Sequence, residues 1–342
     1  MFYRLFLRPL LFLMPAERAH KFTLTLLKIS LRIPIFGALL KRTYSPGKRA
    51  KGIERMGLKF KNRVGLAAGF DKDGKAFRDL ASLGFGFVEI GTVTPEPQIG
   101  NPTPRLFRLP KDQAVINRMG FNNEGAKALW GRLVKGRPKN LILGGNIGKN
   151  KTTPNENAVE DYLRCMTTLH SLVDYFTVNM SSPNTPNLRE LQDKEPLRII
   201  LQTLVDFNQS TPHPKPILLK IAPDLSEGQL DDIAEIVKEL NLAGVVATNT
   251  TISREGLRTP EKVVTSIGNG GLSGAPLKKV SPHIVAHMRK KLGKDFTIIG
   301  VGGIMTAGDA QRMFEAGADL VQIYTGLIYR GPSLISEIAD LD

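Results

Sequence analysis

Residues 177–189, TVNMSSPNTPNLR, form a polar, proline-containing loop that ends an apolar run starting at Tyr175. The aromatic and β-branched residues at 175–178 predict a β-strand. The loop then concentrates amide and hydroxyl groups on Asn179, Ser181, Ser182, Asn184 and Asn187. Such a segment is either ordinary turn chemistry or one edge of a binding site, and the rest of the chain decides between them.

The same pattern, an apolar strand with a polar or glycine-rich ending, recurs along the chain. Strands are predicted at residues 64–70, 85–93, 141–148, 175–182, 217–223, 244–250, 297–303 and 320–326. Helices are predicted between them at 75–83, 123–135, 156–171, 195–208, 227–240, 277–292 and 307–316. Eight apolar strands alternating with helices predict an α/β fold, the (β/α)8 TIM barrel, with an open doubly wound sheet as the alternative. The polar strand endings would then share the C-terminal rim, where barrel enzymes place their active sites.

Two insertions interrupt this alternation. Residues 94–122 contain a predicted hairpin at 105–109 and 114–118, and residues 251–276 form a long glycine-rich connection. Both leave the predicted catalytic rim, where long loops commonly carry substrate specificity.

The charge of the chain is unevenly distributed. The 342 residues carry a formal net charge of +15, and residues 1–51 hold eleven Lys or Arg but one acid, Glu17. The basic excess therefore belongs to the N-terminal segment, and without an accompanying RNA-binding or helix-turn-helix signature we predict no nucleic-acid partner. Cys165 is expected to be a buried core residue, and five scattered histidines predict no metal site.

The N-terminal residues 1–45 predict an α-helical extension. From Pro15 the apolar residues recur at helical spacing with basic residues between them, and Pro34 bends the chain before a second helix at 36–40. No uncharged run approaches the roughly 20 residues needed to span a bilayer. A basic amphipathic helix pair is typical of a membrane-surface anchor, and a helical hairpin packed on the main domain is the alternative.

Glycine clusters at the ends of the last two predicted strands indicate a phosphate site. GVGGI at 300–304 and YTG at 324–326 would expose backbone N–H groups there, and GGLSG at 270–274 would add to them. Lys220 interrupts the apolar run ILLKIAP, where an unpaired ammonium is costly unless an anion meets it. An anionic ligand or cofactor is the predicted partner of Lys220, with a buried ion pair as the alternative; Lys72 is either a site residue or a solvated rim residue.

Ten segments in this order resemble one enzyme family: AAGFDKDG, GTVTPEPQIGNPTPRLFRL, INRMGFNN, NIGKNK, VNMSSPNTPNLR, LLKIAPD, ATNTT, GGLSG, IIGVGGI and VQIYTGLIYRGP. Over essentially the whole chain they are similar to the quinone-dependent, membrane-associated class of dihydroorotate dehydrogenases. The resemblance implies oxidation of (S)-dihydroorotate to orotate in pyrimidine (UMP) biosynthesis. One FMN per chain would accept the hydride, and a membrane quinone, ubiquinone or menaquinone, would be the final acceptor. It also implies a membrane- and quinone-access segment at 1–45 and an FMN-binding barrel at 46–342.

The resemblance also implies a role for individual residues. The catalytic base is Ser182, which as a weak base needs a relay through Thr and water. The implied substrate residues are Lys72, Asn117, Arg118, Met119, Gly120, Phe121, Asn179, Asn184, Asn249 and Thr250. The implied FMN residues are Ala68, Gly69, Phe70, Asp71, Lys72, Thr92, Asn146, Asn179, Lys220, Thr248, Gly274, Gly303, Tyr324 and Thr325. The implied quinone residues are His20, Arg108 and Tyr324.

One position departs from the pattern, since Asn187 stands where many relatives are expected to have Gly; Asn tolerates a positive φ. The expected location is the cytoplasmic face of a bacterial inner membrane, as a peripheral protein, with the mitochondrial inner membrane as the alternative. A monomer is expected, although the sequence leaves the oligomeric state open. The competing hypotheses are a related flavin barrel acting on another pyrimidine and a non-catalytic membrane-surface scaffold.

Overall fold

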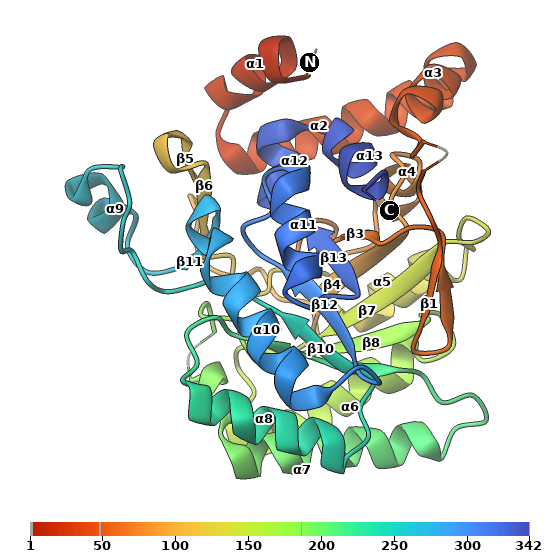
Figure 1. The fold of residues 1–342 in the computed structure, drawn as a ribbon, viewed down its shortest axis with the longest axis vertical. Helices are drawn as coiled ribbons and strands as arrows, with labels where there is room; N and C mark the ends of the chain where they lie inside the picture. Colours follow the sequence, from red (N-terminus) through yellow and green to blue (C-terminus); the bar gives the residue numbers. More distant parts are fainter. Residues whose placement is uncertain (1–2, 48, 186, 342) are drawn as a thin grey trace.

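Eight parallel strands close into a barrel in the computed structural model, which describes residues 3–47, 49–185 and 187–341 (Figure 1). Going round the barrel, the order is β3, β4, β7, β8, β9, β10, β12 and β13, and β13 pairs with β3. The strands are β3 Val64–Leu66, β4 Phe87–Val93, β7 Ile142–Ile147, β8 Tyr175–Asn179, β9 Ile217–Ile221, β10 Gly244–Ala247, β12 Thr297–Val301 and β13 Leu320–Ile323. The predicted TIM barrel is confirmed, and the open-sheet alternative is wrong.

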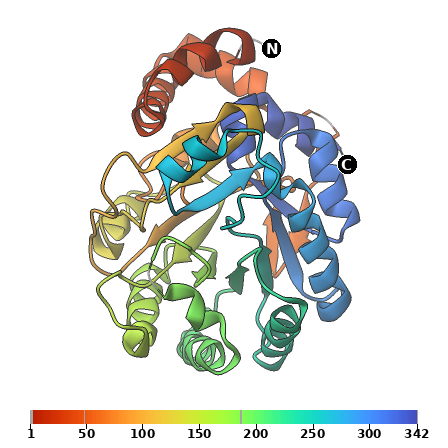
Figure 2. The same cartoon turned by 90° about the vertical axis from the view of Figure 1, so that its left-hand side faces the viewer.

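Helices between the strands form a ring outside the barrel (Figure 2). They are α4 Phe77–Ala81, α5 Ala126–Leu133, α6 Ala158–Leu169, α7 Lys194–Gln209, α8 Glu227–Glu239, α10 Val280–Leu292 and α11 Ala307–Glu315, followed by α12 Thr325–Arg330 and α13 Ser333–Ala339. Each predicted helix has its counterpart. Except for β4, which ends at Val93 as predicted, the strands end earlier than predicted, because the polar and glycine-rich residues after them leave the hydrogen-bonded ladder for the rim. Cys165 is fully buried on α6, as expected.

Side chains fill the barrel interior, and its N-terminal end is apolar. Phe60 closes this end, with its ring 5.3 Å from that of Phe87. It lies on β2 (Leu58–Phe60), which pairs with β1 (Ile53–Arg55) in a hairpin that the sequence analysis did not predict. Gly65 makes room for this packing, because a Cβ there would lie 2.3 Å from the Phe87 ring.

The two insertions meet at the rim in one small antiparallel sheet. The predicted hairpin is confirmed as β5 (Leu106–Leu109) and β6 (Ala114–Asn117). The connection 251–276 is more than a loop, since it contains α9 (Glu261–Ile267) and β11 (Gly271–Gly274), and β11 pairs with β6. Three of the five residues in GGLSG are glycine, so this strand depends on a partner more than 150 residues away in the chain and has no local signal.

The N-terminal extension packs on one side of the barrel, against α4, α12, α13 and β5 (Figure 1). The expected helix pair is confirmed as α2 (Ala16–Arg32) and α3 (Pro34–Tyr44), which meet at 111°. A π-helical turn, η1 (Tyr3–Leu7), and a short helix, α1 (Arg8–Leu13), precede the pair and were not expected. No single helix in the described part of the chain is long and apolar enough to cross a membrane; α2 and α3 pass that test of length and composition only as a bent pair.

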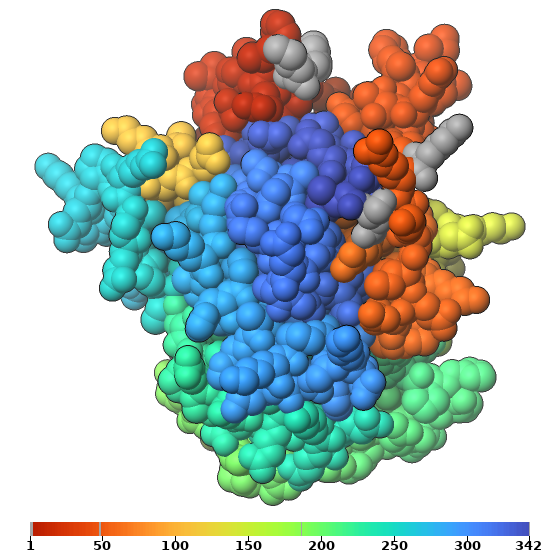
Figure 3. Space-filling view, viewed as in Figure 1, coloured from red at the N-terminus to blue at the C-terminus, as the bar shows by residue number. Residues whose placement is uncertain are grey.

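The extension carries most of the exposed apolar surface among the described residues, and its helices project from the rounded body of the molecule (Figure 3). Eleven of the nineteen exposed large apolar side chains lie on it: Leu5, Phe6, Leu10, Leu13, Phe22, Leu26, Ile29, Ile33, Ile35, Phe36 and Leu39. A helical hairpin that packed fully on the barrel would bury such side chains. Their exposure favours a second surface, outside the protein, as their partner.

A single acid attaches this basic extension to the rim insertion. Both carboxylate oxygens of Glu17 accept hydrogen bonds from Arg105, from Nη2 at 2.9 Å and from Nε at 3.1 Å. Arg105 is buried, and its Nη1 also donates to the carbonyls of Ile99 (2.7 Å) and Asn101 (3.0 Å). The bidentate pair therefore joins α2 to the segment that leads into β5.

We predict that Glu17→Gln loosens α2 without unfolding the barrel, because it leaves the buried Arg105 without its anion. Hydrogen bonds to charged groups contribute about 1.5–3 kcal/mol. Hydrogen exchange should therefore speed up in α2 and stay unchanged in the barrel strands. The control is Lys21→Gln, which removes an exposed lysine 3.6 Å from the same carboxylate. Equal exchange in wild type and Glu17→Gln would contradict the attachment.

The same attachment should depend on pH. The hydrogen bonds from Arg105 lower the pKa of Glu17 below its ordinary value. The stabilisation is therefore complete above the ordinary glutamate pKa, about 4.3, and is lost as pH falls through the lowered pKa of the folded protein. Wild-type α2 should approach the exchange rate of Glu17→Gln only in that acid range.

Candidate active site

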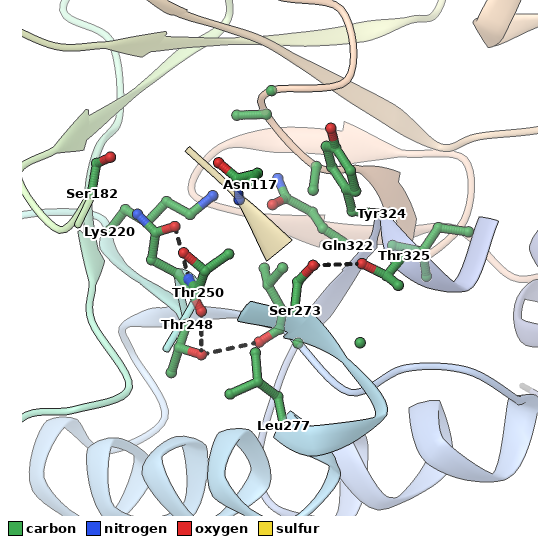
Figure 4. Close-up of a pocket in the computed structure, with 18 of the residues that line it drawn as sticks. Asn117, Ser182, Lys220, Thr248, Thr250, Ser273, Leu277, Gln322, Tyr324 and Thr325 are labelled. Atoms are coloured by element: carbon green, nitrogen blue, oxygen red, sulfur yellow. Dashed lines mark hydrogen bonds between the residues drawn. The ribbon is translucent and has the colours of Figure 1, made fainter. Parts of the chain in front are cut away.

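A cavity opens at the C-terminal ends of the barrel strands, beside β6 and β11. In Figure 4, Ser182 and Lys220 lie on the opposite side of the cavity from Tyr324 and Thr325. The structure brings these sequence-predicted residues to its wall: Ala68, Gly69, Lys72, Thr92, Asn117, Met119, Gly120, Phe121, Asn179, Ser182, Asn184, Lys220, Thr248, Asn249, Thr250, Gly274, Gly303, Tyr324 and Thr325. Segments distant in sequence thus form one site.

Six predicted site residues do not line this cavity: Phe70, Asp71, Arg118 and Asn146, and the two quinone residues His20 and Arg108. Arg118 follows Asn117 and so points to the other side of the chain, where it donates to the carbonyls of Pro104 and Ile267. The carboxylate of Asp71 accepts from the backbone N–H groups of Lys75 and Ala76, both at 2.8 Å, just before α4 begins. Phe70 lies behind Tyr324, with ring centroids 5.3 Å apart. Arg118 and Asp71 are therefore structural in their side-chain contacts.

A fourth predicted residue, Asn146, lies beneath the cavity wall instead of on it. It is fully buried and accepts a hydrogen bond from the Thr92 hydroxyl at 2.5 Å. Asn179 donates to Thr92 Oγ1 at 2.8 Å, and Asn249 donates to Asn179 Oδ1 at 3.2 Å. Asn146 thus supports three side chains that do reach the cavity.

The loop after β8 presents Ser182 to the cavity. Ser182 is 5% exposed, and its Oγ accepts from the backbone N–H of Asn184 at 3.3 Å. Arg189 holds the loop in place, since its guanidinium pairs with Asp224 at 2.8 Å and donates to the Ser181 and Thr250 carbonyls. No histidine or carboxylate bonds to Ser182 among the described residues, so its hydroxyl has no strong base beside it.

Two further features of this loop bear on the predictions. Asn187 has a φ of 55°, which agrees with the argument that an asparagine can replace glycine there. Thr185, three residues after Ser182, is buried, and its hydroxyl has no hydrogen-bond partner within the described residues. It is the loop hydroxyl that remains free to bond a water or a ligand.

Lys72 extends to the cavity from the segment after β3. Its ammonium donates to Asn122 Oδ1 at 2.5 Å. Burial, reinforced by the nearby Arg105, lowers the pKa of Lys72 to about 7. An anion in the cavity would restore its charge, so Lys72 is suited to bind a carboxylate. Lys72 is half-buried and bonded to Asn122, which favours a site residue over the solvated-rim alternative.

Lys220 lies inside the barrel on β9, at the base of the cavity. Lys220 is 5% exposed, and its side-chain ammonium has neither a hydrogen bond nor an ion pair to any described residue. Burial lowers its pKa, and Glu89 is the one acid that opposes this shift. The buried-ion-pair alternative is not what the structure shows, and the cavity is the space left for an anionic partner.

Glycines shape the opposite wall. Gly303 has a φ of 77°, and a Cβ on it would lie 2.5 Å from the backbone nitrogen of Lys278. Gly274 has a φ of 100°, and its Cβ would lie 2.4 Å from the Gln113 carbonyl. Beside them the Ser273 and Thr325 hydroxyls are 2.8 Å apart. A side chain at either position would clash with the neighbouring backbone, so the close packing of this wall and its positive φ values require glycine.

The sequence analysis missed several residues at this site. Asn122 orients Lys72, and Ser273, Leu277 and Gln322 line the cavity. Glu89 lies below it in the apolar run FVEIGTV, where the argument applied to Lys220 would have singled it out. Gln322 in LVQIYTG carries the same signal. Ser273 lies in GGLSG, the segment predicted to add to the phosphate site, but the residue itself was not singled out.

An aromatic series connects the cavity wall to the extension. Tyr324 packs edge-on against Phe70, and Phe70 packs edge-on against His20 of α2 at 4.9 Å. Burial and the nearby Lys72 lower the pKa of His20 to about 4, so its ring is neutral at neutral pH. Arg108 lies apart from this series, donating to the Leu11 carbonyl at 3.0 Å and lying over the Phe12 ring at 4.5 Å. All of these contacts lie where the extension meets the barrel.

Comparison with known proteins places the chain in a family. A family model described as dihydroorotate dehydrogenase matches residues 53–341. The chain is 56% identical to the dihydroorotate dehydrogenase (quinone) of Christiangramia forsetii, over 98% of this chain and 97% of that protein. It is 49% identical to the protein of the same name from Polaromonas naphthalenivorans, over 97% of this chain and 96% of that protein.

Solved structures agree. The crystal structure of the Eimeria tenella enzyme in complex with ferulenol superposes with a TM-score of 0.83 at 38% identity, covering 95% of this chain and 89% of that one. The ligand-free enzyme from the same organism gives 0.80 at 40% identity, covering 88% and 90%. The family inferred from the sequence motifs is confirmed: this chain belongs to the dihydroorotate dehydrogenase family, in its quinone-dependent class.

Proposed function

We propose that this protein oxidises (S)-dihydroorotate to orotate in pyrimidine biosynthesis, with one bound FMN per chain and a membrane quinone as the final electron acceptor. The observation that carries the proposal is the convergence on one cavity of the Ser182 loop, the unpaired Lys220 and the glycine wall after β12 and β13. A base, a buried cation and a phosphate cradle in one place match a flavin enzyme that acts on an anionic substrate.

The cavity has the features that FMN requires. Gly274, Gly303 and Thr325 would hold the phosphate, since they line the cavity where the Ser273 and Thr325 hydroxyls meet. Lys220 and the amides of the wall would meet the ring system, and Lys220 supplies the positive charge that lacks a protein partner. The chemistry that a bound FMN would supply is acceptance of the hydride from C6 of dihydroorotate and transfer of the electrons onward to quinone. Tyr324 and Gly69 would border it on the side facing the extension.

Substrate recognition would come from amides and from Lys72. Asn117 Nδ2 donates to the Gly271 carbonyl at 3.3 Å, and Asn117 Oδ1 accepts from Asn184 at 2.9 Å. These contacts hold both amides at the cavity, where they suit the imide groups of the pyrimidine ring. Lys72 would bind the carboxylate. The Arg118 side chain is left out of this proposal, because its donors are used elsewhere.

Ser182 would remove the proton from C5. A serine hydroxyl is a weak base, so the proton must pass onward as it is taken. Thr185 is proposed as the next group, because its buried hydroxyl is unpaired and lies in the same loop. A water between the two hydroxyls would complete the relay to solvent.

Residues 1–45 are proposed as the membrane and quinone-access segment, and 46–342 as the catalytic barrel. The exposed apolar side chains of the extension would enter the lipid surface at the cytoplasmic face of a bacterial inner membrane, and its basic residues would meet anionic headgroups. His20, Phe70 and Tyr324 would border the route by which quinone approaches the cofactor, with Arg108 holding α1 against it. A monomer would suffice, since every proposed group lies on one chain.

The direct test uses the purified full-length protein under anaerobic conditions. Dihydroorotate should bleach the flavin absorption, and a long-chain quinone added with detergent should restore it. A second sample that receives orotate instead of dihydroorotate is the control, and it should keep its absorption. Protein without flavin, or flavin that dihydroorotate does not bleach, would refute the proposal.

Ser182→Ala should keep FMN and lose most of its dihydroorotate oxidation at neutral pH. Removal of a general base costs about 10²–10⁴-fold in rate. Stopped-flow measurement of flavin bleaching isolates this step from quinone reduction. Thr185→Val should slow the same step less, because water can still take the proton. Near-normal bleaching by Ser182→Ala would remove Ser182 from the role of base.

The affinity for orotate should fall as pH rises above about 7, the pKa of Lys72 in the ligand-free protein. Below that pH the ammonium is charged and attracts the carboxylate; above it, binding must first protonate the lysine, with a limit of about tenfold per pH unit. Flavin difference spectra report the Kd for orotate. Lys72→Met should bind weakly with this pH dependence removed, and a flat wild-type profile would contradict the assignment.

A further inference from the structure

Glu89 lies fully buried in the barrel, on β4, and all its hydrogen bonds come from donors. Oε2 accepts from the Gln322 amide at 2.8 Å and from the hydroxyls of Tyr175 and Thr177 at 3.1 Å each. Oε1 accepts from Asn146 Nδ2 at 2.8 Å. A carboxylate can only accept hydrogen bonds, so each neighbour must turn a donor toward it.

This requirement fixes the orientation of Asn146. With Nδ2 directed at Glu89, its Oδ1 must face the rim, and it accepts from the Thr92 hydroxyl at 2.5 Å and from Asn179 Nδ2 at 3.3 Å. Because Thr92 uses its proton on Asn146, its Oγ1 can only accept from Asn179, as it does at 2.8 Å. The Asn179 amide is thereby oriented in turn.

The same donor-to-acceptor order continues from Asn179 to the cavity wall. Asn179 Nδ2 points inward, so its Oδ1 points outward and accepts from Asn249 Nδ2 at 3.2 Å. Asn249 then presents its own Oδ1 to the backbone N–H of Thr250 at 2.9 Å. Every side-chain donor in this series points toward Glu89. Thr92, Asn179 and Asn249 all line the cavity, so the carboxylate determines which of their atoms remain for a ligand.

A second branch leaves Glu89 through Gln322. Its Nε2 is committed to the carboxylate, so its Oε1 points away. That oxygen is buried and has no partner within the described residues, and Gln322 lines the cavity. An unpaired buried acceptor at this wall is suited to a donor on a bound ligand.

We infer that Glu89 is a positioning residue: its carboxylate sets the donor and acceptor directions of the Asn146–Thr92–Asn179–Asn249 series and of Gln322, and so prepares the cavity for its ring ligands. The inference rests on the proposed function. The inference predicts that ligand binding depends on the hydrogen-bond directions between positions 89 and 146. Which of the two positions carries the negative charge should matter less. Replacing the carboxylate by an amide would place a donor opposite either Asn146 Nδ2 or the Gln322 amide, so at least one of the two branches would have to change its hydrogen-bond direction.

The test compares four full-length holoproteins: wild type, Glu89→Gln, the double variant Glu89→Gln/Asn146→Asp, and Asp161→Asn. The double variant exchanges carboxylate and amide between the two positions. The amide now on β4 would donate to the carboxylate now on β7 and still accept from its three other neighbours. That carboxylate would accept from Thr92 and Asn179, as the Asn146 oxygen does in the wild type. Asp161→Asn is the matched control, because it neutralises a buried acid whose Oδ2 accepts from the backbone N–H of Asn150 at 2.8 Å, outside the series.

The readouts are FMN content and the Kd for orotate from flavin difference spectra. Glu89→Gln should weaken orotate binding about tenfold or more, equivalent to roughly 1.4 kcal/mol, and the double variant should recover most of that loss. Asp161→Asn should bind as wild type does. Unchanged binding by Glu89→Gln, or a double variant no better than the single one, overturns the inference.

Two further outcomes are decided by the same samples. If Glu89→Gln does not fold, a folded and orotate-binding double variant supports the inference, and an unfolded one overturns it. Wild-type protein that holds no FMN or gives no response to orotate overturns the proposed function and the inference with it. Wild-type binding without rescue in the double variant overturns the inference alone.

Discussion

The burial of two charges inside the parallel barrel is the constraint on which the rest of the site depends. Glu89 and Lys220 both lie on barrel strands, below the cavity, and neither is exposed beyond 5%. The two charged groups differ in their hydrogen-bond partners. Glu89 is surrounded by four donors, whereas Lys220 has no bonded partner among the described residues. An uncompensated buried charge destabilises a protein, so a site that keeps one is prepared for an anion.

The same constraint explains why the upper half of the barrel is polar. The N-terminal half packs side chains such as Phe87 and Tyr175 around Phe60. Two residues beyond Phe87, strand alternation returns Glu89 to the interior, and its partners Thr177 and Gln322 follow on their own strands. Polar side chains are tolerated there because each has a partner, except where the cavity takes its place.

The extension and the rim insertion form a second unit joined to this core. Glu17, the single acid of residues 1–51, pairs with the buried Arg105, and His20 meets Phe70 beside the cavity. Many apolar side chains of the helices remain exposed, while others, such as Leu24 and Leu27, pack on the core beside the polar Glu17–Arg105 pair.

The sequence by itself determined the barrel, the helix pair of the extension and most of the cavity wall, since strand periodicity, glycine clusters and long motifs are local signals. It did not predict that the Arg118 and Asp71 side chains bond away from the cavity, nor that residues 251–276 contain β11, which needs β6 as a partner. Only the tertiary structure decided which way each side chain points. The hydrogen-bond direction set by Glu89 likewise depends on residues from four strands and from the loop after a fifth, β10, which no local pattern connects.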